Sequence, residues 1–415
     1  MGAVSHTKPL AAILPRRRAT VAIFVLVAVF LIALPKGGIT SGGVPVTFGY
    51  MLLGACALPA LLGLARVPLQ APALMQLAAG WLPLGLMTVH VTLTGTDSDS
   101  HLIVYATVFA LLPLLILGLY APYLERLTER EIATALTWTI RFAVAWGLMN
   151  FVLFAVAHQF LRVPFLTVNA SDLQDIFARN NRRGALMKLV STYNNGNIYG
   201  ACMVMLETLY LLFEQRRGWR IAFLLSIVLT LSRTAWLGLI ALFFIMAALG
   251  QIRLTRPAVW VLIGGALVSI ATLLPAMGWR SDSIIDDDLG GRLDQLSALS
   301  VTPLGVGRIH VPEIVYAGLI ESFGVIGFGF GCVALGFPLV FGLQRRARLS
   351  PLRKAALAGI ASYLLLACSD GAFILAPVLP LFLGLCALLY RRGFAPVAAL
   401  ARVEPGIAGE PTFAR

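Results

Sequence analysis

The sequence predicts an all-α, polytopic integral membrane protein. Of its 415 residues, 59% are hydrophobic and only 12% are charged, whereas soluble domains carry about a quarter charged residues. Apolar runs close to the roughly 20 residues that cross a bilayer recur along nearly the whole chain. Within lipid, only helices and closed barrels satisfy their own backbone groups, and these runs are continuous rather than alternating, so they predict helices.

We expect twelve membrane spans, with both termini in the cytoplasm. Residues 1–392 form one transmembrane domain, and the tail 393–415, rich in Pro, Gly and Ala, is expected to be disordered. The first apolar run follows three arginines but has no clear small-residue cleavage site, so we interpret it as a retained span rather than a signal peptide. The predicted spans are residues 19–35, 45–65, 73–93, 102–120, 137–160, 198–213, 220–232, 234–250, 258–275, 313–342, 355–369 and 373–390.

The number of spans depends on residues 221–250, an apolar stretch whose only charged residue is Arg233. It could form one long helix or two short ones, and the choice inverts the orientation of everything that follows. A break at Ser232 and Arg233 places eleven later Lys and Arg residues in the cytoplasm and three outside, and an unbroken helix reverses those numbers. Because cytoplasmic loops carry an excess of Lys and Arg, the break is favoured.

Two outer loops are long, residues 161–197 and 276–312, and both lie on the non-cytoplasmic side in this topology. Lys and Arg are usually scarce on that side, yet both loops carry them. The basic residues are Arg162, Arg179, Arg182, Arg183 and Lys188 in the first loop, and Arg280, Arg292 and Arg308 in the second. Their presence predicts an anionic ligand at this face.

The net charge of +13 does not predict a nucleic-acid partner, because the basic residues mark the sides of a membrane. The five cysteines all lie in apolar runs without metal-ligand spacing, so no metal site is expected. The lipid bilayer is the one partner that composition alone predicts.

The first long loop ends with the polar residues 193–197 (YNNGN) just before a predicted span. Asn197 is a candidate N-cap, and a helix that starts there would direct free N–H groups towards Asn194 and the loop. Helix N-termini bind anions in this way, and Arg182 and Arg183 lie just upstream. The alternative is a solvated, capped loop whose arginines touch lipid headgroups.

The second long loop contains residues 303–313 (PLGVGRIHVPE), in which two glycines permit a tight turn before a helix. This pattern predicts that Arg308, His310 and Glu313 lie together at the outer mouth of the bundle. They would supply one phosphate-binding group and two possible proton acceptors. A single loop histidine is more often structural or merely exposed, so a catalytic role for His310 is supported only by its neighbour Arg308.

Four charges fall inside predicted spans, and such charges are functional candidates because each costs ~2.5–3.5 kcal/mol even on a lenient insertion scale. They are Arg141, Glu207, Arg233 and Glu321. Arg141 is close enough to the inner end of its span to reach the interface. Either glutamate could pair with Arg233, and if both did, Arg233 would be a structural bridge.

Three short motifs resemble those of the O-antigen ligase and polymerase superfamily. They are residues 232–236 (SRTAW) at a span junction, the arginine-containing loop ending in 194–197 (NNGN), and 303–307 (PLGVG) before a helix with Leu319, Glu321, Gly324 and Gly327. The similarity covers roughly residues 179–328. It implies an inverting, metal-independent glycosyltransferase without a cofactor, which acts at the periplasmic face of the bacterial inner membrane on a glycan carried by undecaprenyl pyrophosphate.

The resemblance also implies roles for individual residues, with lipid A-core as the acceptor in a ligase. Arg233, Arg308, Arg182 and Arg183 would bind the pyrophosphate and other loop anions, and His310 would be the base. One departure concerns the position eleven residues before Gly324, where ligases usually have a histidine and this chain has Glu313.

Three readings follow from that departure. His310 has shifted within a remodelled turn, or Glu313 is the base, or the chain is a polymerase, in which that histidine is not required. The histidine nearby and the chain length favour the ligase. A secondary transporter, with the four intramembrane charges as a relay, is a different alternative, but only one interrupted helix pair and no internal repeat support it.

Overall fold

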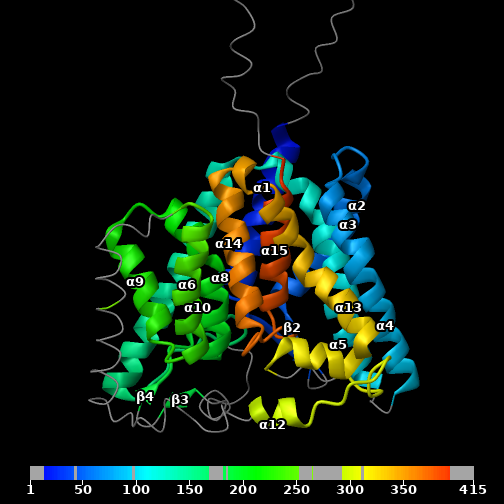
Figure 1. Ribbon diagram of the computed structural model, residues 1–415. Coiled ribbons are helices and arrows are strands. Elements are labelled where there is room, and N and C mark those ends of the chain that lie inside the picture. The colour runs from blue at the N-terminus through cyan, green and yellow to red at the C-terminus, as the bar shows by residue number, and fades with distance from the viewer. Residues whose placement is uncertain are drawn as a thin grey trace, which may run out of the picture.

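The computed structural model is a bundle of helices with two short β-hairpins, and 75% of it is helix (Figure 1). It describes residues 14–41, 44–95, 99–167, 181–183, 186–251, 264, 292–309 and 313–392. The first half contains α1 (Leu14–Ala28), η2 (Val29–Ala33), β1 (Gly38–Ser41), β2 (Val44–Thr47), α2 (Phe48–Leu64), α3 (Ala71–Gln76), η3 (Leu77–Trp81), α4 (Leu82–Thr94), α5 (Asp99–Ala106), η4 (Thr107–Leu111), η5 (Leu114–Tyr120), η6 (Ala121–Arg126) and α6 (Glu129–Ala157). The second half contains β3 (Arg182–Arg183), β4 (Leu186–Met187), η7 (Ser191–Tyr193), α8 (Gly196–Phe213), α9 (Arg217–Val228), α10 (Arg233–Ala248), α12 (Arg292–Ser297), α13 (Val315–Gln344), η9 (Arg346–Arg348), α14 (Pro351–Leu366) and α15 (Val378–Tyr390).

Helices occupy eleven of the twelve predicted spans. The ninth, 258–275, lies outside the described residues apart from residue 264, as does the predicted disordered tail 393–415. Several helices contain π-helical turns, for example η2 and η3, which the apolar pattern did not predict. Hydrophobic periodicity therefore located the helices but not their internal geometry.

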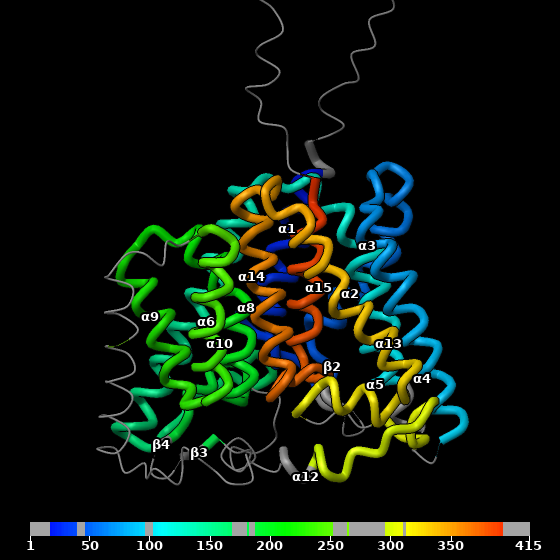
Figure 2. The backbone as a smooth tube through the Cα atoms, in the orientation of Figure 1, coloured from blue at the N-terminus to red at the C-terminus, as the bar shows by residue number. Residues whose placement is uncertain are grey.

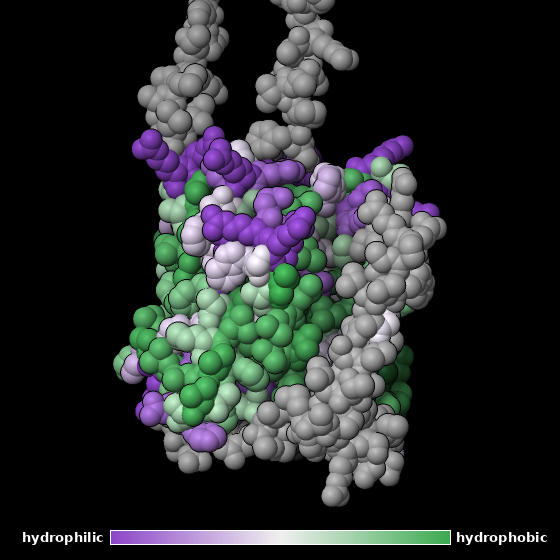
Figure 3. All heavy atoms as spheres, turned by 90° about the vertical axis from the view of Figure 1, so that its left-hand side faces the viewer, coloured by the Kyte–Doolittle hydropathy of each residue, from purple (hydrophilic) through white to green (hydrophobic). Residues whose placement is uncertain are grey.

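The chain is a helical membrane protein. Among the described residues, five helical stretches are long and apolar enough to cross a membrane: Ala71–Thr94, Ile103–Arg126, Glu129–Ala157, Gly196–Phe213 and Val315–Gln344. Shorter apolar helices are Phe48–Leu64, Arg233–Ala248 and Val378–Tyr390. Figure 3 shows a broad belt of hydrophobic side chains, with hydrophilic ones gathered mainly at one end of the bundle.

The chain enters and leaves the bundle at the same end. Arg17 near the start of α1 pairs with Glu131, and Arg391 after α15 donates a hydrogen bond to the carbonyl of Leu127, close to the start of the same helix, α6. We call this end the terminal end, and the opposite end, where residues 181–196 and 367–377 lie, the loop end (Figure 2).

Helix α8 lies at the centre of the bundle and is the most buried of the five long apolar stretches. It packs closely against α14 because Gly359 has no side chain, and a Cβ there would lie 2.2 Å from the carbonyl oxygen of Met205. Thr208 of α8 also donates a hydrogen bond of 2.7 Å to the carbonyl of Ala355. Small residues and interhelical hydrogen bonds of this kind hold membrane helices together, so α8 and α14 provide a fixed frame for the loop end.

Candidate functional site

The break between α9 and α10 places Arg233 at the loop end. Helix α9 ends at Val228 and α10 begins at Arg233, which confirms the predicted break. The Oγ of Ser232 caps α10 by accepting a hydrogen bond of 3.4 Å from the N–H of Ala235. Leu231 is buried with φ 51°, a left-handed conformation that costs about 1–3 kcal/mol outside glycine. Arg233 is thus positioned by a strained turn, at the positive end of a helix dipole.

The turn of residues 369–371, which follows α14, connects this break to the start of α8. The hydroxyl oxygens of Thr234 and Ser369 are 3.4 Å apart, and the amide nitrogen of Asn197 donates to Oδ2 of Asp370 at 2.7 Å. Segments that are far apart in the sequence therefore meet at one point. Arg233, which precedes Thr234, belongs to the same region.

A buried cation and a buried carboxylate are joined here through a neutral amide. Lys188 is 1% exposed and donates from Nζ to Oδ1 of Asn197 at 3.0 Å, while Asn197 in turn donates to Asp370, which is 8% exposed. Charged groups are buried in this way only when they are paired and hydrogen-bonded, because desolvation costs several kcal/mol per ion. The Lys188–Asn197–Asp370 chain is therefore a specific polar arrangement inside an apolar bundle.

The N-terminus of α8 differs from the prediction. Asn195, not Asn197, is the N-cap, and α8 begins at Gly196. The N–H groups of residues 196–199 all have acceptors: the side chain of Asn181 takes the first, and the side chain and carbonyl of Asn195 take the other three. The prediction that Asn197 is the N-cap is therefore wrong, and the first-turn N–H groups that were expected to be free have acceptors within the protein.

The end of the first long loop is buried rather than solvated. Residues 187–194 are all buried. Ser191 donates to the carbonyl of Ala143 in α6 at 2.6 Å, and Thr192 and Tyr193 donate to carbonyls of η2 at 2.7 and 2.9 Å. Asn194 is also buried, in a left-handed conformation, and its carbonyl accepts a hydrogen bond of 3.0 Å from Asn181. This segment is a rigid support for Lys188 and Asn197, which excludes the solvated-loop alternative for these residues.

Arg182 and Arg183 form strand β3, which pairs antiparallel with β4 directly before this buried segment. The backbone N–H of Lys188 donates to the carbonyl of Asn181 at 2.7 Å and closes the hairpin against α8. In the sequence, the two arginines therefore lie a few residues before Lys188 of the Lys188–Asn197–Asp370 chain. Their side chains lie outside what the structure describes.

Glu313 is held at the same turn by its backbone. Its carbonyl accepts a hydrogen bond of 3.0 Å from the N–H of Gly371, and two residues later the N–H of Val315 donates to the carbonyl of Ala367 at 3.0 Å. The entry to α13 is thus fixed to the turn that carries Asp370. His310, the other predicted proton acceptor, lies outside the described residues.

Arg308 lies away from this turn, at the other end of the first segment of α13. It is 60% exposed and its Nη2 is 3.4 Å from Oε1 of Glu321. The segment Val315–Phe323, roughly 12 Å long at 1.5 Å per residue, separates it from the entry to α13. The prediction that Arg308 and Glu313 lie together is therefore wrong, because residues 302–306 bond to the backbone around the Gly324 break and not to the start of the helix.

Helix α13 is interrupted at Gly324, and the second loop supplies the backbone hydrogen bonds that the helix loses there. In a continuous helix the N–H of Val325 would bond to the carbonyl of Glu321, but here it donates to Thr302, and Glu321 accepts from Val306 instead, each at 3.0 Å. Gly324 has φ 66° and a Cβ there would lie 2.4 Å from the carbonyl of Pro303, so only glycine fits. The glycines of residues 303–307 and of α13 thus allow the loop backbone and the helix backbone to come into close contact.

The other intramembrane charges have separate surroundings. Arg141 and Glu214 form a two-point ion pair of 2.6 and 2.8 Å near the terminal end, far from Arg233. Glu321 pairs with Arg308, as described above. Glu207 in α8 is 8% exposed, and its Oε2 has no hydrogen-bond partner among the residues that the structure covers. These charges do not form one continuous relay.

Asp370 was not among the residues that the sequence pattern singled out, although a signal existed. It is the only charged residue between Lys354 and Arg391, so it satisfies the same criterion, a lone charge in an apolar stretch, that identified Arg233. Lys188 was noted only as one of several loop cations. Neither its burial nor its link to Asp370 could be read from the sequence, since 182 positions separate them.

Within the part of the chain that the structure describes, no three His, Cys, Asp or Glu side chains are grouped as metal ligands. The turn of residues 369–371 instead brings together the segments that carry Arg233, Lys188, Asp370 and Glu313. The sequence matches no protein-family model, and no curated protein matches it.

Proposed function

We propose that this chain is an O-antigen ligase. It transfers a glycan from undecaprenyl pyrophosphate to a sugar hydroxyl of lipid A-core, with inversion, at the periplasmic face of a bacterial inner membrane. The single observation that carries the proposal is the meeting of the α8 start, the α10 start and the α13 entry at the 369–371 turn. Charged groups are expensive inside an apolar bundle, so a cluster of them supports a functional role.

The proposed topology has twelve spans, a cytoplasmic terminal end and a periplasmic loop end. It is supported by the distribution of basic residues, because the terminal end carries many arginines at the helix ends, among them Arg66, Arg126, Arg217, Arg346 and Arg348. The helices that flank Arg233 have 12 and 16 residues, or roughly 18 and 24 Å. Helices this short place their joint below the outer surface of a core of about 30 Å.

Arg233 is proposed to bind the diphosphate leaving group. In the reaction, the acceptor hydroxyl oxygen bonds to the anomeric carbon, the bond from that carbon to the diphosphate oxygen breaks, and the diphosphate leaves with the electron pair. Negative charge grows on the leaving group, and a guanidinium in a partly dehydrated site stabilises that charge through a planar, permanently charged fork. Arg308, Arg182 and Arg183 are proposed as further anion ligands, which reach the donor from the kink of α13 and from β3.

The acceptor hydroxyl also loses a proton, and two residues are proposed as its acceptor. His310 has the imidazole chemistry suited to a base near neutral pH. Glu313 is proposed as the alternative base, because its backbone is fixed to the 369–371 turn beside Asp370. The Lys188–Asn197–Asp370 chain fixes that turn and so keeps the base and Arg233 in a constant relation.

A polymerase that extends the lipid-linked glycan is the second candidate. It is favoured by one observation, that Glu313 stands eleven residues before Gly324, the position at which the ligases usually have a histidine. A transporter is less well supported, because Arg141 and Glu321 belong to ion pairs at opposite ends of the bundle rather than to a midplane relay.

The test is transfer of a radiolabelled glycan from undecaprenyl pyrophosphate in membranes that contain the full chain, with lipid A-core added or left out. A ligase labels lipid A-core, whereas a polymerase lengthens the lipid-linked glycan without it. We expect Arg308→Ala to nearly abolish transfer, and His310→Ala to reduce it more than Glu313→Gln. Arg346→Ala, which changes an exposed arginine at the terminal end, is the control and should leave transfer unchanged.

If all of these variants transfer glycan like the wild type at equal expression, the assigned site is incorrect. If no label moves to either acceptor but a labelled solute crosses proteoliposomes that contain the chain, the protein is a transporter.

A further inference from the structure

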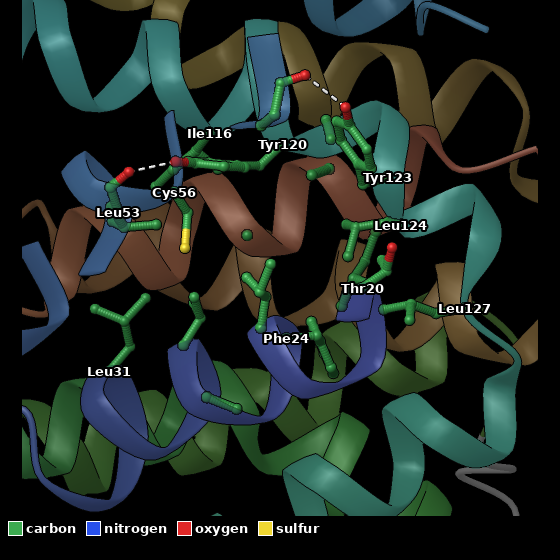
Figure 4. Close-up of a pocket in the computed structure, with 18 of the residues that line it drawn as sticks. Thr20, Phe24, Leu31, Leu53, Cys56, Ile116, Tyr120, Tyr123, Leu124 and Leu127 are labelled. Atoms are coloured by element: carbon green, nitrogen blue, oxygen red, sulfur yellow. Dashed lines mark hydrogen bonds between the residues drawn. The ribbon is translucent and has the colours of Figure 1, made fainter. Parts of the chain in front are cut away.

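A large apolar cavity lies far from the loop-end cluster, between α1 and α2. Its volume is about 480 Å³, within the range of 300–1,000 Å³ that is typical of ligand pockets. Phe24 of α1 and Leu31 of η2 face Leu53 of α2 across it, and Ile116 and Leu124 also line it (Figure 4). Almost all of its lining is hydrocarbon, so its occupant has an apolar body.

The α2 side of the cavity is a fixed wall. Tyr120 donates from its hydroxyl to the carbonyl of Leu53, and Tyr123 donates to the carbonyl of Ala60. The two tyrosines follow one another on η5 and η6, so they tether α2 along its length (Figure 4). Gly49 and Leu53 of α2 are buried, and Tyr50, Ala57, Ala60 and Leu64 are partly buried against the core. The cavity is therefore built into the fold rather than left by loose packing.

The length of the cavity fits the chain of a lipid from a single leaflet. Its lining follows α1 and η2 from Ala19 at the terminal end to Ile32. These fourteen helical residues extend roughly 20 Å. Half of a bilayer core of about 30 Å is roughly 15 Å, so a lipid chain that enters from the terminal end and fills the cavity spans its own leaflet and ends about 5 Å beyond the midplane.

Two arginines lie at the terminal mouth of the cavity and make it positive. Arg66 is exposed, and Arg126 donates to the carbonyl of Arg66 at 3.1 Å with its guanidinium 5.2 Å from the ring centre of Tyr123. Glu125, the residue before Arg126, already accepts hydrogen bonds from the side chain of Gln70 at 3.0 Å and from the backbone of Arg392 at 2.7 Å. The mouth is thus complementary to a phosphate, and basic sites between helices on the cytoplasmic side recognise anionic headgroups.

We propose that this cavity binds one anionic phospholipid from the leaflet at the terminal end, with its phosphate between Arg66 and Arg126. A lipid tail gains little by moving from the bilayer into an apolar cavity, because both surroundings are hydrocarbon. Selectivity therefore comes from the headgroup, and a net negative lipid is preferred over a zwitterionic one. The site depends on the membrane location of the chain and not on the proposed transfer reaction, whose diphosphate would lie at the opposite end.

The test is native mass spectrometry of the full-length protein, delipidated in detergent and titrated with dioleoyl phosphatidylglycerol or dioleoyl phosphatidylcholine. We expect the first phosphatidylglycerol to bind at least tenfold more tightly than phosphatidylcholine. Arg66→Ala and Arg126→Ala should each weaken its binding roughly fivefold, and should leave phosphatidylcholine binding unchanged.

A cavity-filling variant and a matched control test the tail site. A side chain at Gly384 of α15 enters the cavity without a clash, because a Cβ there has no heavy atom within 4 Å. Gly384→Leu should therefore fold and lose at least tenfold in phosphatidylglycerol binding. Gly329→Leu is the control, since Gly329 of α13 is exposed, has equally open surroundings and lies outside the cavity.

Equal binding of the two phospholipids, or wild-type binding by both arginine variants, would overturn the proposal. The arginine variants keep the test decisive even if Gly384→Leu does not fold. Displacement of phosphatidylglycerol by an equimolar amount of undecaprenyl phosphate would also overturn it, because the occupant would then be the carrier lipid.

Discussion

The two ends of the bundle treat buried charge differently. At the terminal end, Arg141 and Glu214 form a closed pair in which the arginine side chain is 12% and the glutamate 1% exposed. At the loop end, the side chain of Arg308 is 60% exposed and 3.4 Å from one oxygen of Glu321, and the amide of Asn197 joins Lys188 to Asp370. An enclosed ion pair stabilises the fold, whereas the exposed guanidinium of Arg308 can still contact a ligand.

The surroundings of Arg141 show how completely a structural charge is satisfied. Its guanidinium lies 5.4 and 5.5 Å from the ring centres of Trp138 and Trp219, so aromatic rings cover it. The hydrogen bond from Arg141 is the main reason that the pKa of Glu214 falls to about 2, and the backbone N–H of Arg216 lowers it further. Glu214 is therefore ionised at any physiological pH, and the pair does not titrate.

Arg233→Ala at the loop end should have the largest effect on transfer, and it tests whether the two ends differ in function. Removal of a fixed donor to the leaving group should lower transfer by about 10²–10³-fold, with little change in the melting temperature of the purified protein. Arg233→Lys should recover only a small part of this activity, because an ammonium lacks the planar fork. The measurement is transfer per milligram of folded protein. A melting temperature that falls together with the activity would mean that Arg233 is structural.

Arg141→Ala should have the opposite effect. It leaves Glu214 as an uncompensated buried charge, which costs about 3–5 kcal/mol of unfolding free energy. Thermal unfolding in detergent should show a clearly lowered melting temperature, while transfer per folded molecule stays within twofold of the wild type. A large loss of transfer with an unchanged melting temperature would place function at the terminal end as well.

A smaller effect is expected for Gly324→Ala at the kink of α13. Alanine at φ 66° is strained, and its Cβ would meet the carbonyl of Pro303, so we expect a loss of about 1–3 kcal/mol in unfolding free energy. Gly336→Ala, in the same helix but with open surroundings, is the matched control and should be neutral or slightly stabilising. Similar melting temperatures for the two variants would mean that the loop–helix contact contributes little.

Much of the helical arrangement could be predicted from the sequence, because hydrophobic length and Lys/Arg asymmetry are local properties. The break at Ser232 and Arg233 is the clearest case: charge asymmetry alone separated α9 from α10. The N-cap of α8 was misplaced by two residues because three asparagines stand close together, and the choice among them depends on which side chain reaches the first N–H groups.

The site was predictable only in part. Arg233 was identified as a lone charge in an apolar run, and it does lie at a helix break. The same criterion applied to Asp370 would have identified the turn whose carboxylate accepts a hydrogen bond from Asn197. The separation of Arg308 from Glu313 could not be foreseen, because it follows from long-range pairing of a loop with the broken α13. Spacing along a chain does not specify such a return path.

The exchange of backbone hydrogen bonds between residues 302–306 and α13 has a consequence for the order of assembly. If α13 entered the membrane without that loop segment, the N–H groups of Val325 and Ile326 and the carbonyl of Glu321 would face hydrocarbon unpaired, and each such group costs several kcal/mol. The two pieces can therefore only reach their final shape together. During biosynthesis the helix has to insert either straight, to bend later, or already joined to its loop.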